Sequence, residues 1–219
     1  MRVLVACEFS GVVRRAFAEY GHYVVSADFE PSDDGSPNHY IGDCFDLIQS
    51  EKFDLMIAHP PCTYFTSAAA WALKDPDYVR YPGVGYHQRV QEGTLTGAAR
   101  RLAQANALLF VQRLAEADIK KIAIENPVGQ LSSLWRKPDQ IVHPWQFGHN
   151  ASKATCLWLK NLEPFDPTDV IRPRIVNGLR RWDNQTDNGQ NKLTPSATRW
   201  KDRSRTYTGI AEAMAEQWG

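Results

Sequence analysis

Largely apolar runs of strand length alternate with helical segments through the first two-thirds of the sequence. The five runs that have the pattern of buried strands are RVLVAC at 2–7, YVVSAD at 23–28, FDLMIA at 53–58, KIAIEN at 121–126 and TCLWL at 155–159. Between them, residues 11–21 and 97–117 carry apolar side chains at helical spacing. This alternation predicts an α/β fold, a mostly parallel, doubly wound sheet with helices on both faces.

Composition narrows the class of protein further. The chain has 219 residues, 43% of them hydrophobic, so it can bury a core without disulfide bonds. Its four cysteines are scattered and form no C-x-x-C pair, which argues against a structural zinc site or a disulfide framework. No apolar stretch approaches the ~18–20 residues that span a bilayer, and no signal-peptide pattern precedes the first strand. We therefore expect a cytoplasmic protein with neither a metal nor a membrane partner.

Polar or otherwise unusual residues gather at one end of the predicted strands. These clusters are CEFSG at 7–11, Asp28, Gly42-Asp43, HPPC at 59–62 and Glu125-Asn126. Ligands of doubly wound sheets bind beyond the carboxyl ends of the strands. A glycine after the first strand lets the backbone approach a ligand, and an acid after the second suits ribose hydroxyls. Each of these residues also suits a turn or a helix cap, but together they predict a nucleoside pocket.

Cys62 directly follows two prolines at the end of a predicted strand. Prolines fix the backbone and remove two amide donors, which would hold the cysteine rigidly at the sheet edge. A thiolate is a strong nucleophile, although most free cysteines are small buried hydrophobes. His59 is close enough in sequence to influence the pKa of this thiol. Glu125 ends a buried run, which predicts either an elevated pKa and a specific partner or a structural cap.

The last third of the chain has a different composition. Residues 161–200 are rich in Pro, Asn, Arg and Gly and lack periodicity, which predicts irregular structure. Nine Lys or Arg stand against three acids in 172–205, where Trp182 and Trp200 lie among them and Tyr207 follows two residues later. Such a mixture suits nucleic acid, with cations on phosphates and rings on bases. A solvated loop can have the same composition.

The clusters resemble the motifs of the DNA cytosine methyltransferases that act at carbon 5 of the base. FDLMIAHPPCTYFTS is similar to the family's core signature, although Thr63 stands where the family usually has Gln. Glu125-Asn126 matches the family's Glu-Asn pair, and TYTGIAEAMAEQ resembles its last helix. CEFSGVV resembles the family's glycine-containing turn but lacks the second glycine of that motif. The resemblance covers roughly residues 3–160 and 204–218.

This resemblance implies a Rossmann-like fold of the S-adenosylmethionine-dependent methyltransferases, with that molecule as cofactor. It implies that Cys62 attacks carbon 6 of a cytosine, that carbon 5 accepts the methyl group, and that Glu125 holds ring nitrogen 3 and the exocyclic amine. The implied catalytic residues are Cys62, Glu125 and Asn126. The implied cofactor-binding residues are Phe9, Ser10, Gly11, Asp28, Phe29, Asp43, Cys44 and Pro60. The implied substrate-binding residues are Pro61, Thr63, Lys153, Arg180, Arg181 and Arg199, with Lys153 in place of a family arginine.

The family's separate target-recognition domain has no full counterpart in this chain. We expect a catalytic domain at 1–160, an irregular basic segment at 161–203 in place of that domain, and a C-terminal helix at 204–219 that packs back on the catalytic domain. The expected partner is double- or single-stranded DNA, which the protein would recognise with short or relaxed sequence specificity. These features suit a compact restriction-modification or phage enzyme, located in the cytoplasm of a bacterial or phage-infected cell. We assign no oligomeric state.

Other functions are compatible with the same residues. RNA or a free nucleotide is an alternative substrate, and HPPCTY is also similar to the Asp/Asn-Pro-Pro-aromatic signature of amino-methyltransferases. A non-catalytic nucleic-acid-binding relic of the fold is a further alternative. In HPWQFGH, the side chains of Trp145, Gln146 and His149 suit a pocket or nucleic acid, and we expect packing roles for the histidines.

Overall fold

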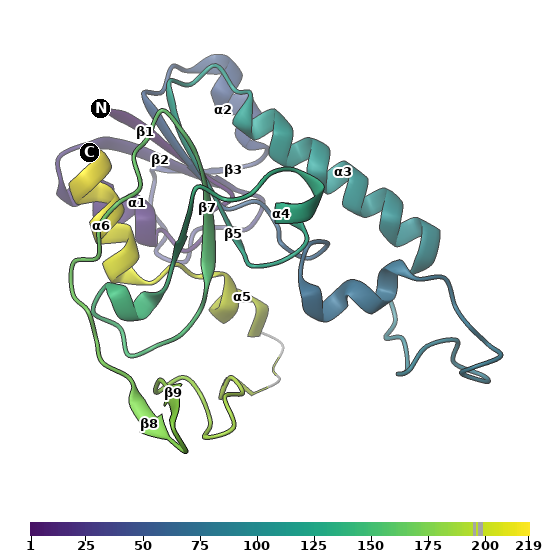
Figure 1. Cartoon of the computed structure of the whole chain (residues 1–219). Coiled ribbons are helices and arrows are strands. Elements are labelled where there is room, and N and C mark those ends of the chain that lie inside the picture. Colours follow the sequence, from purple (N-terminus) through teal and green to yellow (C-terminus); the bar gives the residue numbers. More distant parts are fainter. Residues whose placement is uncertain (195, 197–198) are drawn as a thin grey trace.

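The computed structural model describes residues 1–194, 196 and 199–219, in which helices cover both faces of a central sheet (Figure 1). The sheet has seven strands in the order β3-β2-β1-β4-β5-β7-β6. Their bounds are β1 (Arg2–Ala6), β2 (Tyr23–Asp28), β3 (His39–Ile41), β4 (Leu55–Ala58), β5 (Lys121–Pro127), β6 (Gln140–Val142) and β7 (Thr155–Lys160). A separate two-stranded sheet pairs β8 (Arg174–Val176) with β9 (Leu179–Arg181).

The strand directions follow the α/β pattern with one reversal. β1 to β5 run parallel, and Val5 of β1 lies opposite Ser26 of β2 on one side and Ile57 of β4 on the other. β7 runs antiparallel to both of its neighbours, β5 and β6. This strand order with a reversed β7 is the arrangement of the Rossmann-like methyltransferase fold. The predicted fold class is therefore confirmed, and the reversal of β7 is a feature that the sequence pattern did not indicate.

Helices cover both faces because successive strand residues point to opposite sides. The helices are α1 (Val12–Glu19), α2 (Cys44–Ser50), α3 (Gly97–Ala115), α4 (Leu131–Leu134), α5 (Arg199–Ser204) and α6 (Thr208–Trp218), with 3-10 helices η1 (Ser67–Leu73) and η2 (Pro144–Gln146). Leu4 and Ala6 of β1 belong to the core shared with α2 and α3, whereas Val3 and Val5 belong to the core shared with α1 and α6. The parallel strands, whose carboxyl ends carry the predicted site residues, are therefore packed on both faces by a hydrophobic core.

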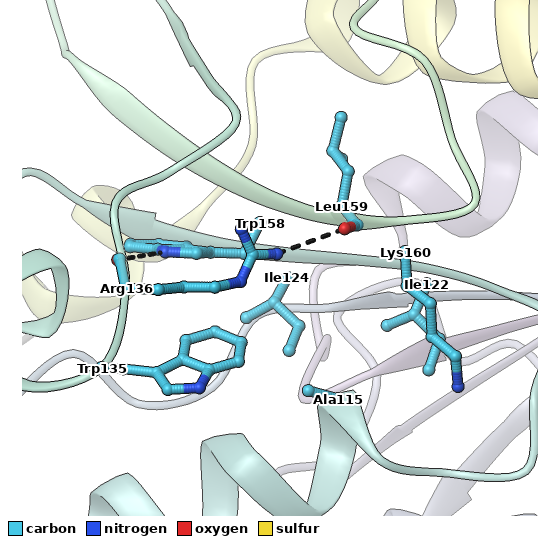
Figure 2. Close-up of a pocket in the computed structure, with 8 residues that line it drawn as sticks. All are labelled: Ala115, Ile122, Ile124, Trp135, Arg136, Trp158, Leu159 and Lys160. Carbon is cyan, nitrogen blue, oxygen red and sulfur yellow. Dashed lines mark hydrogen bonds between the residues drawn. The ribbon is translucent and has the colours of Figure 1, made fainter.

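An apolar hollow of about 190 Å³ lies beside β5 and β7, where the C-terminal end of α3 meets the sheet (Figure 2). Figure 2 shows Arg136 stretched between the rings of Trp135 and Trp158. The guanidinium of Arg136 donates to Leu159 O (3.2 Å), and the Trp158 ring donates to Arg136 O (2.8 Å). Because these polar groups bond to one another and none of the predicted site residues lines the hollow, we regard it as part of the packing.

The 161–203 segment contains more regular structure than its composition predicts. β8 and β9 form a hairpin whose turn residues Asn177 and Gly178 both have positive φ, 51° and 76°. Positive φ at both central residues is the requirement of a type I′ hairpin turn, for which Asn-Gly is the preferred sequence. α5 follows later in the segment, and residues 195, 197 and 198 lie outside the described residues. No helix in the described part of the chain is long and apolar enough to span a membrane.

Candidate active site

Cys62 lies in a tight turn that begins where β4 ends. The amide of His59 donates to the last carbonyl of β1 (2.9 Å), so pairing continues one residue beyond β4. Pro60-Pro61 has no amide to donate, and the chain leaves the sheet there. The amides of Phe65 and Thr66 then donate to Cys62 O at 2.9 and 3.2 Å. The half-buried thiol is therefore attached to a backbone that is fixed on both sides.

The loop after β5 holds this Cys62 turn from one side. The side chain of Asn126, only 1% exposed, donates from Nδ2 to Pro60 O (2.8 Å), and the amide of Gln130 donates to Phe65 O (2.8 Å). A Cβ on Gly129 would lie 2.3 Å from Phe65 O, so only glycine permits this approach. Asn126 therefore acts as a positioning residue for the turn.

α3 holds the Cys62 turn from the other side. The buried guanidinium of Arg100 donates to Thr63 O (2.9 Å) and lies 5.3 Å from the centre of the Tyr64 ring. Gln104 donates from Nε2 to Tyr64 O (2.8 Å). Sequence reasoning missed both helical residues, because nothing in the pattern of α3 distinguishes them from ordinary surface positions. The turn thus has side-chain donors from two elements.

Glu125 on β5 pairs with His59 at the end of the neighbouring strand β4. Glu125 Oε2 lies 3.0 Å from His59 Nδ1, and the two side chains are 13% and 9% exposed. Burial acts to raise the pKa of Glu125, but the hydrogen bond and charge of His59, followed by the charge of Lys153 and the hydroxyl of Thr155, lower it below its usual value. The expected elevated pKa is therefore wrong, because parallel pairing brings a histidine against the carboxylate.

His59 and Asn126 each have one buried polar atom that no other described residue contacts by a hydrogen bond. Since an ionised carboxylate only accepts hydrogen bonds, His59 Nδ1 carries a proton in this pair. His59 Nε2 and Asn126 Oδ1 are buried and have no hydrogen-bond partner among the described residues. Buried polar groups are rarely left unpaired, and the exceptions need an explanation such as a ligand or a functional role. Both atoms belong to residues that contact Glu125 or the Cys62 turn.

The Cys62 thiol is surrounded by charges of both signs. Burial, followed by the negative charge of Glu125, raises its pKa, while the positive charges of Lys153 and Arg203 act in the opposite direction. The thiol is therefore protonated at neutral pH and needs activation before it can attack. Lys153 Nζ donates to Arg203 O (2.8 Å) and Arg205 O (3.3 Å), which ties the end of α5 to this position. Arg203 is another residue that sequence reasoning missed.

Glu8 organises the loop between β1 and α1. This buried carboxylate accepts hydrogen bonds from the amides of Val13 (2.7 Å) and Arg14 (3.3 Å) and from Ser10 Oγ (3.2 Å). The amides at a helix N-terminus hold a pyrophosphate in dinucleotide-binding folds. Here they are already occupied by an acid, so an anionic ligand group would meet a negative charge at this position.

Gly11 serves the packing of this loop. Its φ is +66°, and a Cβ would lie 2.5 Å from Arg14 Nη2 and 2.9 Å from Asp34 Oδ2. Arg14 Nη2 also donates to Asp34 Oδ1 (2.7 Å), which joins α1 to the loop after β2. The glycine therefore makes room for an ion pair, which is the structural role that the sequence left open for it.

The end of β2 presents an acid and an exposed ring. Asp28 Oδ1 accepts a hydrogen bond from the amide of Glu30 (2.9 Å), and burial raises the pKa of Asp28. Phe29 is 77% exposed. Asp43 instead caps α2, accepting from the amide of Phe45 (3.0 Å). Asp28 and Phe29 can together hold a flat heterocycle that carries hydroxyl groups.

α5 reaches this edge of the sheet from the far end of the chain. Lys201 Nζ lies 2.9 Å from Glu30 Oε2 and 5.3 Å from the centre of the Phe9 ring. Arg205 and Asp33 form a second ion pair at 2.8 Å. Part of the basic segment thus covers the loop after β2, a contact that no local sequence pattern indicates.

The other predicted residues lie in different surroundings. Cys44 is buried at the start of α2, where its thiol hydrogen-bonds that of Cys7. Arg180 and Arg181 lie on β9, and Arg199 begins α5. No hydrogen bond or ion pair in the described part of the chain joins these three arginines to the Cys62 turn. The described residues also contain no cluster of three or more His, Cys, Asp or Glu that could hold a metal ion.

Comparison with known proteins gives structural likeness only. No protein-family model matches the sequence, and no curated protein matches it significantly. A prophage-encoded protein of E. coli, described as a DNA modification methyltransferase, aligns with a TM-score of 0.46 and 13% identity over 81% of this chain and 53% of its own. A mutant of Spodoptera frugiperda DNMT2 aligns with a TM-score of 0.39 and 12% identity over 82% of this chain and 57% of its own. The chain thus spans little more than half the length of either protein.

Proposed function

We propose that this chain transfers a methyl group from S-adenosylmethionine to carbon 5 of cytosine in DNA, through a covalent intermediate on Cys62. The observation that carries the proposal is the placement of Cys62 in a turn at the end of β4 that Asn126 and Arg100 hold, with Glu125 and Lys153 near its thiol. Burial and then Glu125 raise the pKa of this thiol, and Lys153 lowers it. A nucleophile, a carboxylate and a cation around one position suit attack on a heterocycle whose charge changes during the reaction.

In the proposed reaction, the sulfur of Cys62 forms a bond to carbon 6 of the base, and the electron pair of the double bond between carbons 5 and 6 makes carbon 5 nucleophilic. Glu125 takes up the proton that the thiol releases and shares it with ring nitrogen 3, which neutralises the charge that develops on the ring. Once carbon 5 has accepted the methyl group that the cofactor would supply, water takes the proton from carbon 5, and the electron pair of that C–H bond restores the double bond. The bond to sulfur breaks, and the thiolate that leaves takes its proton back from Glu125. Asn126 and Arg100 keep the Cys62 turn in place.

The residues after β1 and β2 fit S-adenosylmethionine better than a dinucleotide. Glu8 occupies the amides that would otherwise bind a pyrophosphate, whereas a cofactor with no phosphate and with positive charge has no conflict with this carboxylate. Asp28 can accept hydrogen bonds from ribose hydroxyls, and the exposed ring of Phe29 can stack on the adenine. When bound, this cofactor supplies the methyl group.

The proposal is tested with DNA that contains 5-fluorocytosine. Fluorine cannot leave carbon 5 as a proton does, so we expect a denaturation-resistant complex between protein and DNA in the presence of S-adenosylmethionine. The complex should be absent in Cys62→Ser and present in Cys156→Ala, which removes a buried thiol outside the turn. Absence of any complex on both single- and double-stranded DNA, despite cofactor binding by calorimetry, would contradict the proposal.

The raised pKa of the Cys62 thiol favours one competing function. In that alternative the thiol is only a packing group, and an amino nitrogen of the base accepts the methyl group. Transfer of radiolabelled methyl groups to DNA distinguishes the two reactions, because Cys62→Ser would keep its activity in the amino-methyltransferase and lose it in the carbon-5 enzyme.

A further inference from the structure

A second hollow lies between η2 and the β8–β9 hairpin, formed by residues other than those of the Cys62 turn. It has a volume of about 380 Å³, and its lining includes Trp145, Trp182, Arg172, Arg180 and Ile175. Two of its lining residues are joined by a backbone hydrogen bond, in which the amide of Ile171 donates to Trp145 O (2.8 Å). The hollow therefore combines two indole rings, two guanidinium groups and an apolar rim.

Aromatic rings are stacked on one wall of this hollow. The rings of His143 and Trp145 are 5.7 Å apart and inclined by 28°, and those of Trp145 and Trp182 are 5.8 Å apart and inclined by 24°. The Nε1 donor of Trp182 is buried and has no hydrogen-bond partner among the described residues. A stack of this kind can be extended by one more flat ring.

The two arginines of the hollow differ from their neighbours on the same hairpin. Arg174 pairs with Asp187, and Arg181 donates from Nε to Asp187 O (2.8 Å). In contrast, no hydrogen bond or ion pair to another described residue involves the guanidinium groups of Arg172 and Arg180. Two unneutralised cations beside stacked rings are the features that recognise the phosphates and bases of an unpaired nucleic-acid strand.

The hollow is connected to the active site through the backbone that follows Trp182. The amide of Asp183 donates to Asn150 O (3.0 Å), and the amide of Ser152 donates to Asn184 Oδ1 (2.9 Å). The next residue, Lys153, acts electrostatically on both Cys62 and Glu125. The segment from Asn150 to Lys153 therefore links the hairpin that borders the hollow to the surroundings of Cys62.

We propose that this hollow binds an unpaired base of the nucleic-acid strand that carries the target cytosine, with the flanking phosphates on Arg172 and Arg180. The link to a target cytosine rests on the proposed function, whereas binding of the base does not. In a duplex the faces of the bases are hidden by stacking, so such a site selects single-stranded or locally unpaired nucleic acid. The substrate class that follows is a strand with at least two unstacked bases.

The experiment measures the binding of a fluorescently labelled oligothymidylate by anisotropy. This strand has no cytosine, so its binding does not depend on the methylation reaction. We expect Trp182→Leu to weaken binding on the order of 5- to 150-fold, the range that stacking of one base on an aromatic ring covers. Trp135→Leu is the matched control, because Trp135 is a half-buried tryptophan that lines the other hollow. An abasic strand of equal length should bind weakly and show no further loss in Trp182→Leu.

Arg180→Gln provides a second test, which removes a charge from an exposed side chain of the hollow. The slope of log affinity against log salt should become shallower by roughly 0.7, the value for one phosphate contact on a single strand. Lys52→Gln, which removes an exposed cation paired with Asp118, should leave the slope unchanged. Equal affinities of wild type and Trp182→Leu, no binding of the oligothymidylate, or tighter binding of duplex than of single strand would each overturn the inference. Weakened binding in Trp182→Leu without a 5-fluorocytosine complex would instead uphold the base site and reject only the proposed function.

Discussion

The pairing of His59 with Glu125 leads to a prediction about stability, in which His59→Leu removes the partner of a buried carboxylate. The lost hydrogen bond to a charged group costs about 1.5–3 kcal/mol, and leaving one member of a buried ion pair alone costs about 3–5 kcal/mol. Lys153 and Thr155 still act on Glu125 in the variant. We therefore expect a loss of about 2–3 kcal/mol in the free energy of unfolding in urea at about pH 7.

The dependence of this loss on pH distinguishes an electrostatic effect from a packing effect. In the wild type the pKa of Glu125 is lowered, so its contribution to stability is present above the ordinary glutamate pKa and is lost as pH falls through the lowered value. In His59→Leu, burial becomes the dominant influence and raises the pKa of Glu125, so the ionised carboxylate destabilises the fold above that ordinary value. The difference between the two proteins should therefore grow as pH rises from about 4 to about 7.

Two further variants control for the loss of imidazole packing. His59→Asn keeps an amide donor near the position of Nδ1 and should recover part of the stability at neutral pH. Glu125→Gln removes the charge, so adding His59→Leu to it should give a loss that varies little with pH. An equal loss from His59→Leu at both pH values in the presence of Glu125 would refute the electrostatic reasoning.

Three other predictions concern the edge of the sheet. Gly129→Ala places a Cβ against Phe65 O and should lower the free energy of unfolding by about 1–3 kcal/mol, measured by urea denaturation; an unchanged midpoint would contradict the close approach. Lys153→Met removes a cation that lowers the pKa of the Cys62 thiol, so the rate of alkylation by iodoacetamide should rise only at higher pH than in wild type; an unshifted profile would exclude this coupling. Asp43→Ala removes the cap of α2 and should cost about 1 kcal/mol in thermal unfolding, whereas no loss would mean that the cap is not needed.

The fold could be predicted largely from local patterns, because buried parallel strands and amphipathic helices leave a periodic signal. The reversal of β7 could not, since TCLWL is a buried run in either direction. The β8–β9 hairpin had a usable signal, the Asn177-Gly178 pair, which the irregular composition around it obscured. Local patterns therefore give the type of an element more reliably than its direction.

The candidate site depended more on contacts between distant parts of the chain. Cys62 and Glu125 stand out because a cysteine after Pro-Pro and an acid at a buried strand end are unusual by themselves. His59 and Glu125 are 66 positions apart, and their contact follows only from the pairing of β4 with β5. Glu8 had a weaker signal, an acid directly before the glycine turn, but only the structure shows that it occupies the amides of α1. The sign of the pKa shift at Glu125 was consequently beyond sequence reasoning.

The basic segment shows why net charge is a poor guide to a binding surface. Lys201 and Arg205 form ion pairs with acids of the loop after β2, and Arg174 is neutralised by Asp187. Lys201 and Arg205 hold their part of the chain against the loop after β2, whereas Arg174 is paired within the basic segment. None of these three cations can bind a phosphate without breaking a structural contact. Arg172 and Arg180 form no ion pair with another residue that the structure describes, and they lie beside stacked rings. Which cations of a long basic stretch remain available for phosphates therefore depends on the pairing of charges in the folded chain and not on its net charge.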